Sequence, residues 1–394
     1  MLGKAVCQRF KLQHASMLLI ASKMLFNSQK KFIGMLIGAT FSAFIIMQQP
    51  GIYQGVSDRL VAQLRSIKQA DLWVLSHESS AFDDPTYFKS MDIYRVQSVP
   101  GVKSVVQIYR SWYSLEHLKT HKKMSWELIA VDPKTLIGLP EKMLAGSRDS
   151  IRHSNAIIID GYALKQFETA AKKTIQLGDE LFDGQRTFIV TGITKPLRTY
   201  MYQPKFYMLS SHIPNVANRP SFILVKVNPA ANINDVARKI HAITQYDALT
   251  PKEFSERALT FFQKKTPIII IFISVAVLGF IIGLILMWQI FSNFTLTHLH
   301  QFGMLKMLGV SNSILIKMVF FQAAITGGGG YLLGLLLTLL FGIIFYDTTV
   351  AFHLTWSIAC LGALGTLFII LLASYFSVLK VLRLDTVDLC RDVN

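Results

Sequence analysis

Four long apolar stretches, one near the start of the chain and three in its last third, enclose a long segment of mixed polar and apolar residues. A helix needs about 20 mostly apolar residues to cross the hydrocarbon core of a bilayer. Each stretch is close to that length. We therefore predict four transmembrane helices, at residues 32–50, 266–291, 313–346 and 356–379.

The charges beside these helices predict their orientation. Residues 1–31 hold several basic residues and no acidic one, whereas the turn at 347–355 has no Lys or Arg. Since Lys and Arg next to spans are retained in the cytoplasm, we expect both termini on the cytoplasmic side of the cell inner membrane and residues 51–265 outside it. Residues 292–312 then form a cytoplasmic loop, and residues 380–394 form a cytoplasmic tail.

The segment before the first span carries its own helical pattern. Leu18, Leu19, Ser22, Leu25 and Phe26 recur at helical spacing. Within the cytoplasmic segment 1–31, this predicts an amphipathic helix over residues 12–31. It lies either on the inner membrane face or on the protein's own cytoplasmic surface.

The outer segment alternates short β-like and helical stretches. Its first residues keep a helical stripe that would extend the first span outward as a stalk. Asp183-Gly184 is a hairpin turn signal, and 162–170 and 233–243 have helical spacing. We expect strands near 72–75, 102–109, 126–131, 156–159, 187–193 and 222–227. Together these elements predict a membrane α-helical protein with an extracytoplasmic α+β domain of antiparallel strands.

Composition narrows the function. The formal net charge is +16, but the basic residues of the outer segment form no dense run with interleaved aromatic residues, so nucleic-acid binding is not expected. Membrane lipids are the expected anionic partners. The three cysteines, Cys7, Cys360 and Cys390, all lie outside residues 51–265. Disulfides and thiolate metal sites are therefore excluded from the outer domain.

The cytoplasmic loop between the second and third spans predicts a short helix over 296–309. Gly309 suits a left-handed C-cap and Ser311 suits the following N-cap. Such a helix, held between two spans, has the shape needed to receive force from a motor. A surface helix that covers the bundle would have the same pattern.

The same loop resembles that of the MacB/FtsX superfamily, the mechanotransmission class of ABC-transporter permeases. The family pattern is matched at Gly303, Leu305, Lys306, Leu308 and Gly309. His300 and Gln301 replace its Arg-Glu pair, and residues 381–388 are similar to its closing element. The resemblance implies that Gln301 and the five matched residues contact a dimer of a cytoplasmic ABC ATPase.

Motifs in the outer segment are most similar to the DevC-like branch of this superfamily, whose permeases work with a membrane-fusion protein. They lie at 70–75, 99–110, 131–140, 156–161 and 177–181. Haem-export permeases share the layout, so the branch does not identify the substrate. The resemblance implies a periplasmic membrane-fusion protein as a partner.

The chain has no phosphate-binding loop of the Gly-x-x-x-x-Gly-Lys-Ser/Thr type. We therefore expect no enzyme activity and no cofactor here, with ATP and Mg bound by a separate ATPase. His117 and His121 have the spacing of a helical metal pair, but no third ligand accompanies them. The neighbouring lysines favour a solvated basic patch instead.

Small residues recur at four-residue spacing in the first two spans. Such rows let helices approach closely in lipid. The resemblance implies that these permeases pair through their first two spans, so we expect a second copy of the chain as a partner. The expected dimer contacts are Gly34, Gly38, Ser42, Gly279 and Gly283.

No span carries Asp, Glu or Arg at its centre, which argues against a channel or an ion-coupled transporter. An amphiphile with an anionic head, such as a lipid, glycolipid or haem, would meet the outer mouth of the first two spans. The residues there also suit ordinary interfacial anchors. They are Gln48, Gln49, Tyr53, Phe261, Phe262, Lys264 and Lys265.

Two functions fit this sequence. The first is the permease subunit of an ABC exporter that passes ATP-driven motion to the outer domain. The second is an FtsX-like regulator that uses the same motion to activate an extracytoplasmic hydrolase and carries no substrate.

Overall fold

The computed structural model describes residues 18–89, 91–200, 203–213, 219–346 and 348–382. These residues form two compact units. The membrane unit contains the described residues up to Gly55 and from Pro267 onward, and the outer unit contains Val56–Thr266.

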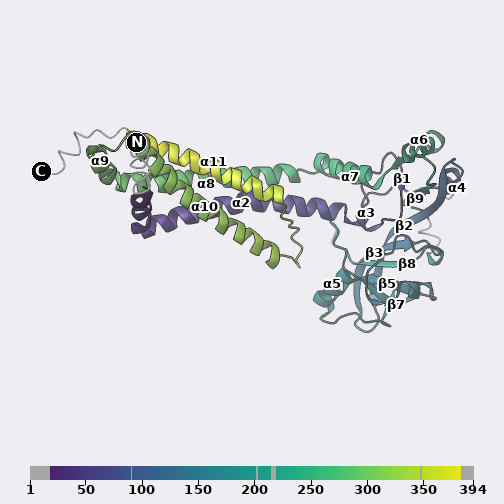
Figure 1. Cartoon of the computed structure of the whole chain (residues 1–394). Coiled ribbons are helices and arrows are strands. Elements are labelled where there is room, and N and C mark those ends of the chain that lie inside the picture. Colours follow the sequence, from purple (N-terminus) through teal and green to yellow (C-terminus); the bar gives the residue numbers. More distant parts are fainter. Residues whose placement is uncertain (1–17, 90, 201–202, 214–218, 347, 383–394) are drawn as a thin grey trace, which may run out of the picture. The chain divides into compact units, whose positions relative to one another are not determined.

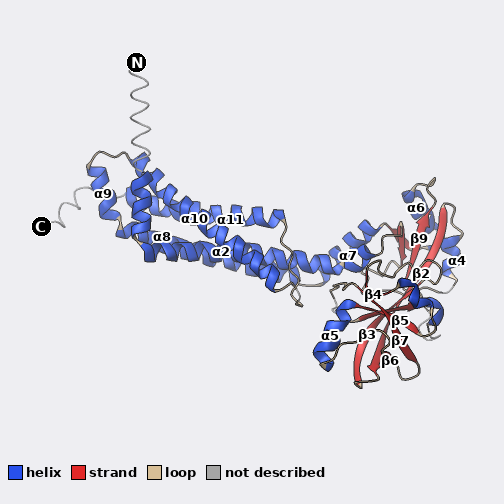
Figure 2. Ribbon diagram, turned by 60° about the horizontal axis from the view of Figure 1, so that its bottom comes forward, coloured by secondary structure: helices blue, strands red, loops and turns tan. Residues whose placement is uncertain are grey.

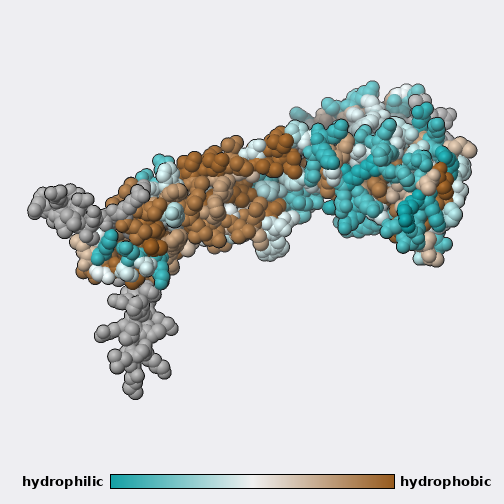
Figure 3. Space-filling model, turned by 90° about the horizontal axis from the view of Figure 1, so that it is seen from above, coloured by the Kyte–Doolittle hydropathy of each residue, from teal (hydrophilic) through white to brown (hydrophobic). Residues whose placement is uncertain are grey.

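The membrane unit holds four helices that are long and apolar enough to span a bilayer. They are α2 (Gln29–Leu60), α8 (Ile268–Thr297), α10 (Asn312–Ile344) and α11 (Trp356–Leu382). The short helix α9 (Leu299–Met307) joins α8 to α10 (Figure 1). Apolar side chains cover the visible face of this bundle (Figure 3).

Helix α2 is longer than the span predicted for residues 32–50. Pro50 lies inside it, and the helix continues to Leu60. The membrane environment tolerates a proline within a helix where neighbouring helices support the freed backbone groups. Next to the proline, Phe352 packs at Gly51, and the amide of His353 donates a hydrogen bond to the Gly51 carbonyl over 2.9 Å. This bond does not replace the one that Pro50 removes, because that one would have joined residue 50 to the carbonyl of Ile46.

Small residues bring α2 into contact with the three other spans. A side chain at Gly283 of α8 would overlap Ser42, one at Gly330 of α10 would overlap Ala39, and one at Gly362 of α11 would overlap Met47. In lipid, where close packing drives helix association, such contacts decide which helices meet. Helix α2 is therefore the common contact of the bundle.

The small residues predicted as dimer contacts pack against other helices of the same chain. Gly38 lies against Met287, Gly34 lies nearest to Ile290, and a side chain at Gly279 would overlap Ile45. Ser42 is fully buried and donates a hydrogen bond to the Gly38 carbonyl. The homodimer, and its contact through these small residues, stay predictions.

A helix at Leu18–Asn27 precedes α2; residues 12–17 of the predicted amphipathic helix lie outside the described part of the chain. Ala21 and Leu25 are buried in the core of the membrane unit. The side-chain amide of Gln322 donates a hydrogen bond to the Ala21 carbonyl over 2.9 Å. One face therefore packs on the protein, while Leu19 and Phe26 stay exposed.

The outer unit is built on one ten-stranded sheet with the main order β10-β1-β9-β2-β3-β8-β5-β7-β4 (Figure 2). The strands are β1 (Leu72–Leu75), β2 (Val102–His117), β3 (Lys122–Val131), β4 (Met143–Gly146), β5 (Ala156–Asp160), β6 (Glu180–Phe182), β7 (Thr187–Thr194), β8 (Lys205–Leu209), β9 (Phe222–Val227) and β10 (Asp247–Leu249).

The sheet is mixed, so the expectation of antiparallel strands alone is wrong. Strand β3 pairs in parallel with β8, and β5 pairs in parallel with β7. Parallel neighbours need a crossover connection, and α5 (Gly161–Ala171) provides part of the one between β5 and β7. The hairpin turn at Asp183-Gly184 is confirmed, because β6 and β7 pair around it.

Helices cover the sheet over three apolar cores. Helices α4 (Asp92–Gln97) and α6 (Ile233–Thr244) cover the β1 and β9 end. Helix α5 covers the β5 and β7 end through Phe167. Helices α3 (Ala62–Ser66) and α7 (Pro251–Lys265) contribute Leu64 and Phe254 to the third core.

Two glycines of α10 provide a test of the bundle packing. Gly330→Ala should lower the thermal stability of the detergent-purified chain by about 1–3 kcal/mol, because the new methyl group overlaps the rigid Ala39. Gly328→Ala is the matched control, since its methyl group would meet no atom within 4 Å. Equal melting temperatures for the two variants would contradict the close contact of α2 and α10.

Candidate functional site

The loop helix α9 begins one residue after α8 ends. Its C-terminus is a Schellman turn, in which the Val310 amide donates to the Leu305 carbonyl over 3.1 Å and the Gly309 amide donates to the Lys306 carbonyl over 3.0 Å. Gly309 has a φ of +86°, so the predicted left-handed cap is confirmed. Ser311 occupies the N-cap of α10 but makes no side-chain capping bond.

Helix α9 has one buried and one exposed face. Phe302 and Gly303 are buried, and Leu305 packs partly against the same core. The opposite face exposes Met304, Met307 and Leu308, and Leu308 is 80% exposed. Of the other predicted coupling residues, Gln301 and Gly309 are exposed and Lys306 is half-buried. An exposed apolar face on a short helix is typical of a protein contact.

A groove of about 630 Å³ runs between the helix Leu18–Asn27 and the start of α9. His298 stands at the junction of α8 and α9, where its ring is buried and lies 3.1 Å from the Ser28 hydroxyl. The groove is lined by Ile20, Ser22, Lys23, Met24, Phe26, Asn27, His298 and Gln301. The N-terminal helix and α9 thus share one surface.

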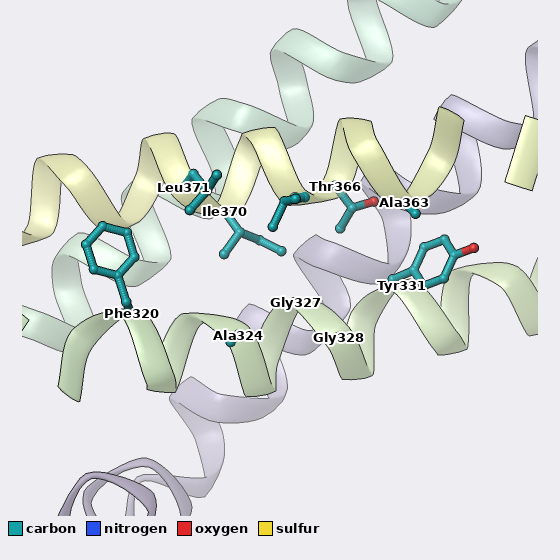
Figure 4. A pocket seen from close by; sticks show the side chains of 10 residues that line it. Phe320, Ala324, Gly327, Gly328, Tyr331, Ala363, Thr366, Ile370 and Leu371 are labelled. Carbon is teal, nitrogen blue, oxygen red and sulfur yellow. The ribbon is translucent and has the colours of Figure 1, made fainter. Parts of the chain in front are cut away.

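A second cavity of about 320 Å³ lies between α10 and α11 (Figure 4). Phe320, Gly328 and Ile370 line it together with Tyr331 and Thr366. The Tyr331 hydroxyl donates to the Ala359 carbonyl over 3.1 Å, and the Thr366 hydroxyl donates to the Gly362 carbonyl over 2.7 Å. With both hydroxyls engaged, the lining suits hydrocarbon.

The outer unit buries a network of charged side chains. Glu127 is fully buried and accepts hydrogen bonds from Arg110 and Lys205. Burial alone would raise the pKa of Glu127, but Lys205 and Arg110 outweigh it and hold the pKa below its usual value. Arg110 also lies 2.9 Å from Asp83 and over the rings of Phe82 and Trp112.

Asp160 ends β5 in the same region. Its Oδ1 atom accepts hydrogen bonds from the Leu197 amide over 3.0 Å and from the Thr194 hydroxyl over 3.3 Å. Strand pairing aligns Glu127 with Lys205 and Asp160 with Thr194. Burial raises the pKa of Asp160 to about 7. Sequence reasoning missed this residue, because nothing local to β5 shows that its last side chain is covered.

The prediction that His117 and His121 lie in a solvated basic patch is wrong for His117. That residue lies on β2 and is buried, with Nε2 3.3 Å from Asp179 and the ring against Phe167. His121 is exposed beside Glu116. Among the described residues, no group of three or more His, Cys, Asp or Glu side chains could hold a metal ion.

The seven predicted entrance residues fall in both units. In the membrane unit, Gln48 and Gln49 are half-buried and Tyr53 packs on Phe272. In the outer unit, Lys264 and Lys265 are exposed and Phe261 is half-buried. Phe262 is buried against Tyr200, with ring centroids 5.0 Å apart. Phe262 therefore packs within the outer unit, and the substrate entrance stays a prediction.

Two family models match the chain. The one described as MacB-like periplasmic core domain matches residues 32–243, more than half of the chain. The one described as FtsX-like permease C-terminal matches residues 270–386. A search of curated proteins found no match.

Two solved structures similar to this chain are extracytoplasmic domains. One is the extracellular domain of the noncanonic ABC-type transporter YknZ from Gram-positive bacteria, with 18% identity, a TM-score of 0.34, and coverage of 46% of this chain and 99% of that one. Another is the periplasmic region of MacB from Actinobacillus actinomycetemcomitans, with 15% identity, a TM-score of 0.35, and coverage of 49% and 94%.

The buried Asp160 predicts a pH dependence of stability. Burial raises its pKa to about 7 in the folded chain, above the ordinary value of 3.8. Between these two values the folded state holds a proton that the unfolded chain has lost, so stability falls as pH rises from about 4 to 7. Within that window each pH unit should cost up to about 1.4 kcal/mol, and the loss should level off above pH 7. Asp160→Asn should remove this slope in melting temperatures measured from about pH 5 to pH 7. If the melting temperature of the Asp160→Asn variant fell with pH as steeply as that of the unaltered chain, another titrating group would cause the pH dependence.

Proposed function

Because the chain belongs to the MacB/FtsX superfamily of ABC-transporter permeases, we propose that it is the permease subunit of an exporter that transmits ATP-driven motion from a cytoplasmic ATPase to its outer domain. The cargo is an amphiphile, and a membrane-fusion protein completes the path outward. The ATPase is a separate subunit, because this sequence has no phosphate-binding loop.

The exposed face of α9 is the observation that carries the proposal. The helix is connected to α8 by one residue and to α10 by the short turn after Gly309. A force applied to Leu308 or Met304 therefore reaches two spans directly. The groove beside the helix Leu18–Asn27 enlarges the surface that an ATPase dimer would contact.

The connections to the outer unit support transmission outward. Helix α2 continues beyond the first span to Leu60, and α3 follows after one residue. Helix α7 begins with a capping box, in which Thr250 and Glu253 bond to each other's backbone amides. Only Thr266 and Pro267 separate its end from α8. Two helical connections thus join the membrane helices to the sheet.

The interior of the membrane unit favours an amphiphile over an ion. The spans have no Asp, Glu or Arg at their centres, and the cavity between α10 and α11 is lined almost wholly by carbon. Purification with the ATPase in mild detergent, followed by mass spectrometry, would identify the cargo. Recovery of an outer hydrolase without any amphiphile would instead favour the regulator.

The coupling surface can be tested at its most exposed residue. Leu308→Asp should abolish ATPase binding by the purified chain and leave its melting temperature unchanged, because the side chain is 80% exposed. Leu144→Asp, at an exposed leucine of β4, is the matched control and should bind the ATPase normally. Normal binding by the Leu308 variant would remove α9 from the interface.

The proposed topology can be tested by labelling whole cells. Cysteine at Ser154, an exposed position of the outer unit, should react with an impermeant maleimide in a background without Cys7, Cys360 and Cys390. Cysteine at Asn312, also exposed, should react only after lysis. Ser79 is unsuitable for labelling because its side chain is buried. The opposite labelling pattern would reverse the orientation of the chain.

A further inference from the structure

The segment Lys195–Tyr200, here called the strap, follows β7 and is anchored on the sheet. The Leu197 amide donates to Asp160 over 3.0 Å, and the Lys195 amide donates to the Lys142 carbonyl over 2.9 Å. Pro196 fixes one backbone dihedral of the strap. The Pro196 ring lies beside Gly161. A Cβ added to this glycine would be 3.1 Å from the Cδ atom of Pro196. The first half of the strap is thus bound to β5 and α5.

The second half of the strap meets the helices that connect to the membrane unit. Tyr200 packs edge-on against Phe262 of α7, with an interplanar angle of 77°. Burial lowers the pKa of Arg59, at the outer end of α2, and Arg198 lies close enough for the two like charges to repel and to lower it further. Thr199, between Arg198 and Tyr200, is buried. The six residues of the strap therefore link the sheet to α7.

Helix α7 makes two separate aromatic contacts. Phe254 packs on Trp73 of β1 and Phe222 of β9, with ring centroids 5.7 Å and 5.8 Å away. Phe262 lies eight residues later, about 12 Å along the helix, and contacts Tyr200 of the strap. The first contact holds the β1 and β9 end of the sheet directly. The second reaches the β5 and β7 end through the strap.

We propose that the strap is the link through which movement of α7 reaches β5 and β7, with Tyr200 and Asp160 as the positioning residues at its two ends. The role of the strap in transmitting movement rests on the proposed function, since α7 moves only if the membrane helices do. The contacts of the strap do not depend on that function, because they are made within this chain. A glycine is needed at position 161, because an added Cβ would lie 2.6 Å from the Thr194 carbonyl oxygen and would displace the start of the strap.

The test measures how tightly α7 is held to each end of the sheet. Spin labels on the full-length chain in lipid nanodiscs, with Cys7, Cys360 and Cys390 replaced by Ser, would report distance distributions. The test pair joins Glu256 of α7 to Ala170 of α5, and the control pair joins Glu256 to Lys239 of α6. All three positions are exposed.

We expect Tyr200→Ala and Phe262→Ala each to widen the α7–α5 distribution about twofold, because losing one contact lets the helix sample a second arrangement. The double variant should widen it no further, since both changes remove one contact. Tyr200→Phe should restore the narrow distribution, and the α7–α6 distribution should stay narrow throughout.

Two results would overturn the proposal. The first is a narrow α7–α5 distribution in the Tyr200→Ala chain. The second is equal widening of both pairs, which would show that the strap only stabilises the outer unit as a whole. Neither result involves the ATPase. A result against the strap would therefore leave the proposed function open, because that function is tested separately by ATPase binding of the Leu308 variant.

Discussion

The close approach of three helices to α2 is the constraint on which the membrane unit depends. Hydrocarbon offers no hydrophobic gain for joining helices, so association relies on contact between backbones. Glycines of α8, α10 and α11 supply that contact at Ser42, Ala39 and Met47 of α2. Because α2 continues to Leu60 without a break, the helix that organises the bundle is also the one that enters the outer unit. Packing within the membrane and the outward connection are therefore properties of a single helix.

The outer unit depends on a different constraint, the burial of charge. Arg110, Glu127 and Lys205 come from three neighbouring strands and satisfy one another away from water. Removing one partner from such a cluster leaves an uncompensated charge, which is far costlier than the net gain from the intact set. The cluster therefore fixes the alignment of β2, β3 and β8. Asp160 adjoins this cluster and holds Leu197, so the strap begins where the sheet is least able to shift.

Sequence periodicity was sufficient for the spans, the loop helix and six of the strands, because each of these is defined by neighbours close in the chain. It failed for β8, whose first residue is a lysine buried by Glu127, a partner 78 residues away. It also failed for His117, which is buried beside Asp179. The small-residue rows indicated helix contacts correctly, but no local pattern shows whether Gly279 meets its own chain or another. Long-range partners decide all three cases.

The two connections between the units differ in mechanical character. Helix α2 is continuous across Gly55, and a continuous helix resists bending and transmits both push and rotation. The other connection passes from α7 through Thr266, whose backbone is extended, to Pro267, which donates no backbone hydrogen bond. That break transmits displacement but little rotation. Under the proposed function, motion entering at α9 would reach the sheet through α7, and the contacts of Phe254 and Phe262 would distribute it within the outer unit. One continuous and one interrupted connection are compatible with the proposed conversion of movement of the membrane helices into a change in the outer domain.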